Sequence, residues 1–184
     1  MEKLQGYDEA EALTGEYEVL KPGKYICKIV NAREDVSIKS GRRMLVIDFD
    51  IAEGEHKDFY KRKHQEALVS NTEAKWGGVY RQMLEGEKAS GFLKGMMTSL
   101  EACNPKFKWD WDESKLVGLK FGGLFGREQY KGNDGNLKFA TKLRFIRSIN
   151  GLKDAEIPAD KLLPAEANMN PYGWEQVNDE NLPF

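Results

Sequence analysis

Basic and aromatic residues alternate in several stretches of this 184-residue sequence. The clearest examples are KDFYKRKH and GREQYKGNDGNLKFATKLRFIR. Lysine and arginine bind phosphates, and exposed aromatic rings stack on bases without reading their sequence. We therefore expect an interface for single-stranded DNA, formed by Lys39, Arg42, Arg43, Lys57, Tyr60, Lys61, Arg62, Lys63, Trp76, Tyr80, Arg127, Tyr130, Lys131, Lys138, Lys142 and Arg144.

Catalytic motifs are absent from the sequence. It contains no GxSxG, no HExxH and no P-loop. A metal-dependent nuclease is one alternative, because Asp48, Asp50, Glu53 and Glu55 could bind a metal ion. The regular alternation of the two aspartates with apolar residues favours instead the solvent-facing side of a strand. We expect a protein that is not an enzyme and that uses no cofactor and no metal.

Charge divides the chain into three parts. Residues 1–18 and residues 151–184 each carry a net charge of −5, whereas residues 19–150 carry 25 basic and 17 acidic residues. A basic body suits a polyanionic partner, and acidic ends can compete for the same surface. The sequence thus predicts an acidic N-terminal extension over 1–18, a DNA-binding domain over 19–150, and a linker with an acidic, flexible tail over 151–184.

Hydrophobic spacing predicts mainly β structure. Period-two alternation predicts strands at about 24–32, 42–52, 56–64, 116–130 and 137–149. In the last of these, alternation places Phe139 and Phe145 on the apolar face. Glycines 118, 122, 123 and 126 suggest that the fourth strand is bent and bulged.

Helical spacing appears between the third and fourth predicted strands. Apolar residues recur from Leu93 to Cys103 at i, i+3, i+4 and i+7, with Asn104-Pro105 as a stop signal. Weaker patterns suggest helices at 73–85 and around 156–166. The order strand, strand, strand, helix, strand, strand matches a five-stranded Greek-key barrel of the OB-fold type, with the helix inserted between strands 3 and 4.

The final residues, DENLPF, resemble the acidic Pro-Phe tip of bacterial single-stranded DNA-binding proteins. The resemblance implies that the tail recruits replication or recombination enzymes. A phenyl ring beside a free carboxylate suits capture in a pocket with a basic rim. An alternative is an adaptor that occupies such docking sites without binding DNA. The partner-binding residues are expected to be Asp179, Glu180, Leu182, Pro183 and Phe184.

A second resemblance spans roughly residues 17–147. The stretches LKPGKYICKIVNARED, SGRRMLVIDFDIAEGEHKDFYKRK and LVGLKFGGLFGREQYKG resemble a family of small phage and prophage proteins similar to OB-fold single-stranded DNA-binding proteins. The resemblance implies a role in phage replication, recombination or repair. The sequence has no apolar run of membrane length and no signal-peptide core, so we expect a protein of the bacterial cytoplasm, away from membranes. A homo-oligomer is a further expectation.

Overall fold

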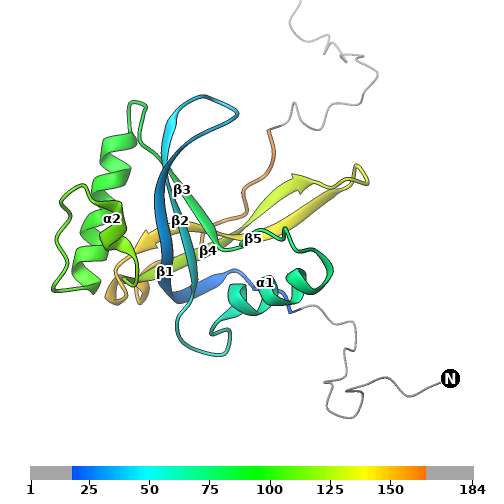
Figure 1. The fold of residues 1–184 in the computed structure, drawn as a ribbon, viewed down its shortest axis with the longest axis horizontal. Coiled ribbons are helices and arrows are strands. Elements are labelled where there is room, and N and C mark those ends of the chain that lie inside the picture. Colours follow the sequence, from blue (N-terminus) through cyan, green and yellow to red (C-terminus); the bar gives the residue numbers. More distant parts are fainter. Residues whose placement is uncertain (1–17, 165–184) are drawn as a thin grey trace, which may run out of the picture.

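The computed structural model describes residues 18–164, which form one five-stranded antiparallel sheet and two α-helices (Figure 1). The predicted partner-binding residues 179–184 lie outside the described residues, as do residues 1–17. No helix within 18–164 is long and apolar enough to cross a membrane. The elements are β1 (Gly23–Val36), β2 (Arg43–Ile51), α1 (Phe59–Ser70), β3 (Val79–Met83), α2 (Ala89–Cys103), β4 (Lys120–Lys131) and β5 (Leu137–Arg147), with short 3-10 helices at Glu113–Leu116 and Asn150–Leu152.

The sheet has the strand order β3-β2-β1-β4-β5. The long central strand β1 pairs with β2 over most of its length and with β4 over its first six residues. Lys28 on β1 therefore lies between Asp50 on β2 and Lys120 on β4. Two long hairpins, β1–β2 and β4–β5, extend away from this central part of the sheet (Figure 1).

The core lies on one face of this curved sheet. Ile47, Phe49 and Ile51 on β2 are buried there, as their alternation predicts, and Phe121 and Phe125 on β4 join them. Each such side chain contributes about 1.5–3 kcal/mol when it is fully removed from water. α2 contributes the stripe that its spacing predicts, and it contacts β3, β4 and β5; its buried residues are Ala89, Leu93, Met96, Met97 and Leu100.

The predicted third strand at 56–64 is wrong, because most of this segment belongs to α1. The local alternation of apolar and basic residues is real, but only Phe59 of the helix is buried. The deciding feature is remote in sequence. The carboxylate of Asp50 on β2 accepts backbone hydrogen bonds from Tyr60 (2.9 Å) and Lys61 (3.0 Å) and so begins the helix.

The predicted weak helix at 73–85 is also wrong, because residues 79–83 form strand β3 at the edge of the sheet. Gly78 shows why an extended chain is favoured here. A Cβ at this position would lie 2.3 Å from the carbonyl oxygen of Phe49 and 2.7 Å from the ring of Tyr60. The backbone therefore packs directly against β2, where it pairs instead of coiling.

On β5, the predicted burial of Phe139 and Phe145 is wrong. Both rings are exposed, and the guanidinium groups of Arg127 and Arg147 lie 5.0 and 5.3 Å from their respective centroids. A bulge opposite Leu124 and Phe125 shifts the register of the strand. As a result, Leu143 and Ile146 enter the core.

The chain continues to pack on β4 after residue 150. Leu152 is buried, and its side chain lies where a Cβ on Gly122 would clash. The sequence predicts a short helix around 156–166, but residues 156–164, the part that the structure describes, form none. Lys161 pairs in parallel with β4, because its N–H donates to the carbonyl of Arg127 and its carbonyl accepts from Gln129. The segment covers an edge of β4 that β1 leaves open.

Candidate nucleic-acid interface

A cleft of about 660 Å³ lies where β1, the end of β2, the start of α1 and the start of β4 meet. Four lysines from these elements and their connections line it, together with one indole ring: Lys28, Lys57, Lys61, Lys120 and Trp76. Lys120 forms an ion pair with Glu53 at 2.7 Å. Within residues 18–164, Lys28, Lys57 and Lys61 form no ion pair. The cleft therefore combines unpaired ammonium groups with an aromatic surface.

Backbone and carboxylate hydrogen bonds fix the walls of this cleft. Asp50 begins α1 and so sets the position of Lys61, whose side chain belongs to the first turn of the helix. The indole N–H of Trp76 donates to the carbonyl of Phe49 at 3.0 Å. Its ring is half-buried beside His64, with the two ring centroids 5.4 Å apart. Trp76 is therefore held in place, with part of its surface open to the cleft.

The outer face of the sheet extends the basic surface beyond the cleft. Val46 on β2 is paired with Arg33 on β1 and with Arg81 on β3, so both arginines lie on the same face. Val46 is only 1% exposed although it lies on this face. We attribute its burial to the aliphatic stems of the flanking arginines. Arg33 also binds Asp48 at 2.7 Å, whereas Arg81 forms no ion pair in the described part of the chain.

The loop between β1 and β2 lies at the far end of this face (Figure 1). Lys39 and Arg42 are exposed on it, and neither forms an ion pair within the described residues. Ile38 is also completely exposed there. β1 spans eight residues from the cleft at Lys28 to the start of this loop, or about 27 Å. The cleft, the outer face and the loop thus form one basic track along β1 and β2.

Two tyrosines predicted to stack on bases lie against the core. The ring of Tyr60 packs edge-on against Phe49, with centroids 5.3 Å apart, and beneath Gly78. Tyr80 packs against the core from β3. Burial raises the pKa of both hydroxyl groups, and for Tyr80 the charge of Arg147 opposes the rise. Neither ring offers a free face for a base.

Three cations predicted for the interface are held elsewhere by acidic residues. Arg43 makes two hydrogen bonds to Glu34, at 2.6 and 2.9 Å, and lines a different cavity. Arg62 binds Glu18 at 2.8 Å. Lys63 binds Glu66 at 3.0 Å along α1. The carboxylates of Glu34 and Glu18 have pKa values below their ordinary range, because of the hydrogen bonds from Arg43 and, for Glu18, chiefly from His56.

The remaining predicted cations lie on the β4–β5 hairpin, away from the cleft. Lys142 and Arg144 surround Glu128 at 3.4–3.5 Å, and Arg144 is half-buried. Tyr130 and Lys131 are exposed near the tip of the hairpin. Two further residues are held in ion pairs, Arg127 with Asp160 and Lys138 with Asp134.

Sequence reasoning missed Lys28, Arg33 and Lys120. The signal for Lys28 was the alternation along β1, which puts its side chain on the face of the strand opposite to that of the buried Cys27 and Ile29. Lys120 had no such signal, because it joins the cleft only through the pairing of β4 with β1. Tertiary structure alone brings Lys28 and Lys120 to Lys57 and Lys61, and places Arg33 beside Val46 on the outer face of the sheet.

The acidic residues considered for a metal site have other partners. Asp50 is buried and accepts hydrogen bonds from three backbone N–H groups, those of Ile51, Tyr60 and Lys61. Asp48 is bound to Arg33 and Asn31. In the described part of the chain, no group of three or more metal-ligating side chains is close enough to hold a metal ion. The geometry therefore gives the nuclease alternative no support.

Comparison with known proteins identifies a family for the first half of the chain. No curated protein matches the sequence. The family model described as "Protein of unknown function (DUF669)" matches residues 5–102. This range contains β1, β2, α1, β3 and nearly all of α2, with every residue of the cleft except those after the 3-10 helix at Glu113–Leu116. The match covers more than half of the sequence, so the chain belongs to the DUF669 family.

Proposed function

We propose that this protein binds single-stranded DNA without sequence preference. The observation that carries the proposal is the cleft that Lys28, Lys57 and Lys61 line together with the half-buried ring of Trp76. Ammonium groups would contact consecutive phosphates, while a base stacks on the indole ring. Such a stack contributes roughly 1–3 kcal/mol and does not depend on the identity of the base.

The rest of the basic track supports a path for several nucleotides. Arg33 and Arg81 lie between the cleft and the loop that carries Lys39 and Arg42. Its length of about 27 Å is compatible with the lower end of the range of about 4–16 nucleotides that one OB-fold binds. We expect each phosphate contacted to add about −0.7 to the slope of log affinity against log salt.

The topology supports an OB-type barrel that is partly open. The sheet order β3-β2-β1-β4-β5 places β3 and β5 at its two edges. Tyr80 of β3 packs against the same hydrophobic core that contains Leu143 and Ile146 of β5, so both edge strands lie along one core. α2 lies between β3 and β4 in the chain and contacts both edge strands. OB-folds bind oligonucleotides on strands 2 and 3 and on the loops between strands 1–2 and 4–5. The basic track shares β2, Arg81 of β3 and the β1–β2 loop with that surface.

A titration of the full chain with oligo-dT at several salt concentrations tests the proposal. The wild-type protein should bind with an affinity that falls steadily with salt. Replacing both Lys57 and Lys61 with alanine should weaken binding at least tenfold and reduce the salt slope by about 1.4, the sum for two phosphates. Lys106→Ala, at an exposed position outside the cleft, is the matched control and should bind like wild type. If the wild-type protein does not bind oligo-dT at low salt, the proposal is contradicted. The adaptor that does not bind DNA would then be the remaining candidate function.

We further propose that residues 179–184 recruit a partner protein of phage DNA replication, recombination or repair. The support is the acidic and apolar composition of this segment: Asp179 and Glu180 precede Leu182, Pro183 and Phe184. Removing residues 175–184 should leave the affinity for oligo-dT equal or higher while abolishing partner binding. Markedly weaker DNA binding by the truncated chain would contradict this division of roles.

A further inference from the structure

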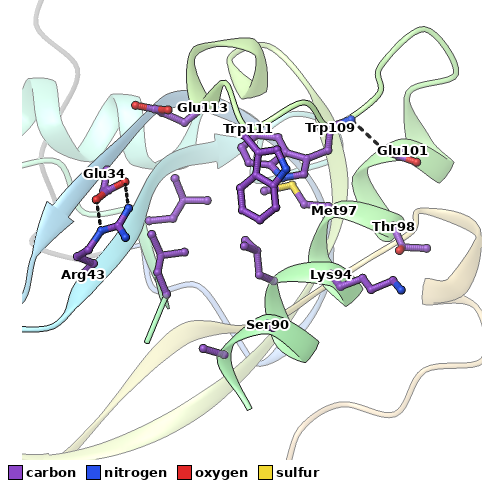
Figure 2. Close-up of a pocket in the computed structure, with 14 residues that line it drawn as sticks. Glu34, Arg43, Ser90, Lys94, Met97, Thr98, Glu101, Trp109, Trp111 and Glu113 are labelled. Carbon is purple, nitrogen blue, oxygen red and sulfur yellow. Dashed lines mark hydrogen bonds and ion pairs between the residues drawn. The ribbon is translucent and has the colours of Figure 1, made fainter. Parts of the chain in front are cut away.

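A second cavity, of about 600 Å³, lies between α2, the far ends of β1 and β2, and the loop that follows α2 (Figure 2). Its apolar lining comes from β2, from α2 and from the connection after β3: Leu45, Leu84, Leu93 and Met97. The rings of Trp109 and Trp111 stand together over this lining, with centroids 5.9 Å apart. We call this cavity the tryptophan groove.

The loop that carries the two tryptophans is fixed to α2. Glu101 accepts a hydrogen bond from the backbone N–H of Trp109 at 3.0 Å and another from Lys108 at 2.9 Å. These two interactions lower the pKa of the Glu101 carboxyl group, the backbone bond contributing most. Trp111 has a φ of 70°, in the left-handed region that large residues rarely adopt, and is 77% exposed. A large apolar ring is therefore held in water at the mouth of an apolar groove.

The rim of the tryptophan groove is unsuited to a phosphate backbone. Glu34, Glu101 and Glu113 line it, against Arg43 and Lys94. Glu113 forms no ion pair within residues 18–164. The body around it is basic, with 27 basic and 21 acidic residues over 18–164. Arg43 neutralises Glu34 and Lys108 neutralises Glu101, so Glu113 is the unpaired carboxylate of the rim within the described part of the chain. The groove is thus an apolar site with one unpaired carboxylate at its edge, and it complements an apolar ligand that carries a cation.

The β4–β5 hairpin of the same chain has that character. Phe139 is paired with Gln129, and Leu137 with Lys131, so these four residues share one face. Phe139 is 43% exposed and Leu137 is 44% exposed. The guanidinium group of Arg127 lies over the ring of Phe139 but is paired with Asp160, so Lys131 is the cation that this surface offers to a partner. We call this surface the arm face.

The arm face and the tryptophan groove lie at opposite ends of the long axis of the molecule (Figure 1). They cannot meet within one copy of this structure, but they can meet between two. We propose that the arm face of one copy docks in the tryptophan groove of the next, with Leu137 and Phe139 entering the groove and Lys131 near Glu113. A contact between two different surfaces does not close on itself and builds a row of molecules.

The consequence of this contact for DNA binding rests on the proposed function. The contact does not cover the opposite face of the hairpin, which carries Tyr130 and the ion-paired Lys138 and Lys142, so this face stays open to single-stranded DNA. A row of molecules joined arm to groove would therefore bind long single-stranded DNA cooperatively. The partner in this contact is a second copy of the same chain.

Two substitutions test the contact by complementation. Phe139→Asp disrupts the arm face and leaves the tryptophan groove intact. Trp111→Asp disrupts the tryptophan groove and leaves the arm face intact. Aspartate tolerates the left-handed backbone of position 111 better than most residues. Val69→Asp, a change from an exposed apolar residue on α1 to an acid, is the matched control. Sedimentation velocity without DNA measures the association of the full-length chains, and circular dichroism checks that each variant is folded.

The wild type and Val69→Asp should form species larger than dimers as the concentration rises, while each single variant stays monomeric. An equimolar mixture of Phe139→Asp and Trp111→Asp should form a one-to-one dimer and nothing larger, because only one intact arm and one intact groove remain. A wild type that stays monomeric at every concentration, or a mixture that does not associate, overturns the proposal. Persistent association of either single variant would do the same. If complementation holds but oligo-dT does not bind, the contact stands and the proposed DNA-binding function fails.

Discussion

The carboxylate of Asp50, on β2, accepts backbone hydrogen bonds from Tyr60 at 2.9 Å and Lys61 at 3.0 Å. These two N–H groups belong to the first turn of α1, where no residue of the helix can satisfy them. Asp58, which directly precedes the helix, makes no side-chain capping bond. A residue of the sheet thus replaces the local cap and fixes the helix beside the cleft. Stability and the geometry of the candidate interface therefore depend on the same contact.

Removing this contact should destabilise the protein. We expect Asp50→Ala to lower the free energy of unfolding by about 1–3 kcal/mol, because it leaves buried N–H groups without acceptors. Asp50→Asn should cost less, since its carbonyl oxygen still accepts one bond. Urea unfolding followed by circular dichroism measures both. Asp154→Ala, at an exposed position, should change stability by no more than about 0.5 kcal/mol; an equal loss at both positions would argue against the cap.

Gly78 and Gly95 form a matched pair for testing close packing. A Cβ on Gly78 would meet the Phe49 carbonyl oxygen at 2.3 Å, whereas a Cβ on Gly95, within α2, would have no atom within 4 Å. Gly78→Ala should therefore lower stability by about 2–4 kcal/mol through overpacking. Gly95→Ala should raise it by about 0.5–1 kcal/mol, because alanine favours a helix interior. Thermal unfolding of both variants would show opposite shifts in Tm.

Trp76 is expected to report DNA binding by its fluorescence. If a base stacks on its indole ring, oligo-dT should quench the emission of the wild type, and Trp76→Phe should lose most of that quenching. The substitution keeps an aromatic face but removes the hydrogen bond to Phe49, so a loss of affinity below tenfold is expected. Trp109→Phe serves as the control and should retain the quenching. Undiminished quenching in Trp76→Phe would show that the strand does not contact this ring.

The segment that covers β4 should loosen at acid pH. Hydrogen bonds and the charge of Arg127 hold the pKa of the Asp160 carboxyl group below its ordinary value. The ion pair therefore stabilises the segment above the ordinary carboxyl pKa of about 4 and loses its effect as pH falls through the lowered pKa. The amide resonance of Lys161, whose N–H donates to the Arg127 carbonyl at 2.9 Å, should move toward its unfolded position only below about pH 4.

Asp160→Asn should produce that loosened state at neutral pH, as measured by NMR or by faster proteolysis near residue 161. Asp154→Asn is the control for the charge change alone. An identical Lys161 resonance in wild type and Asp160→Asn at pH 7 would show that the ion pair does not hold the segment.

The sequence by itself determined the elements whose hydrophobic pattern is strong. The alternation from Leu45 to Ile51 and the helical stripe from Leu93 to Leu100 are both found as predicted, because each pattern buries one complete face in the core. Sequence also identified Lys57, Lys61 and Trp76, since cations and aromatic rings are visible without a fold. It could not show that these three residues share one cleft.

Only the tertiary structure decided the parts that depend on contacts distant in sequence. α1 replaces a predicted strand because Asp50 satisfies its first N–H groups, and β3 replaces a predicted helix because Gly78 packs against Phe49 and Tyr60. A bulge between Leu143 and Phe145 turns Phe145 outward, and Phe139, on the same face as the buried Leu143, is exposed further along the hairpin; alternation alone cannot foresee either result. A local hydrophobic pattern shows which side chains are buried. Where that pattern is weak, contacts with other strands determine whether a segment forms a helix or a strand. The same pairing of β1 with β2 and β4 brings Lys28 and Lys120 to the cleft.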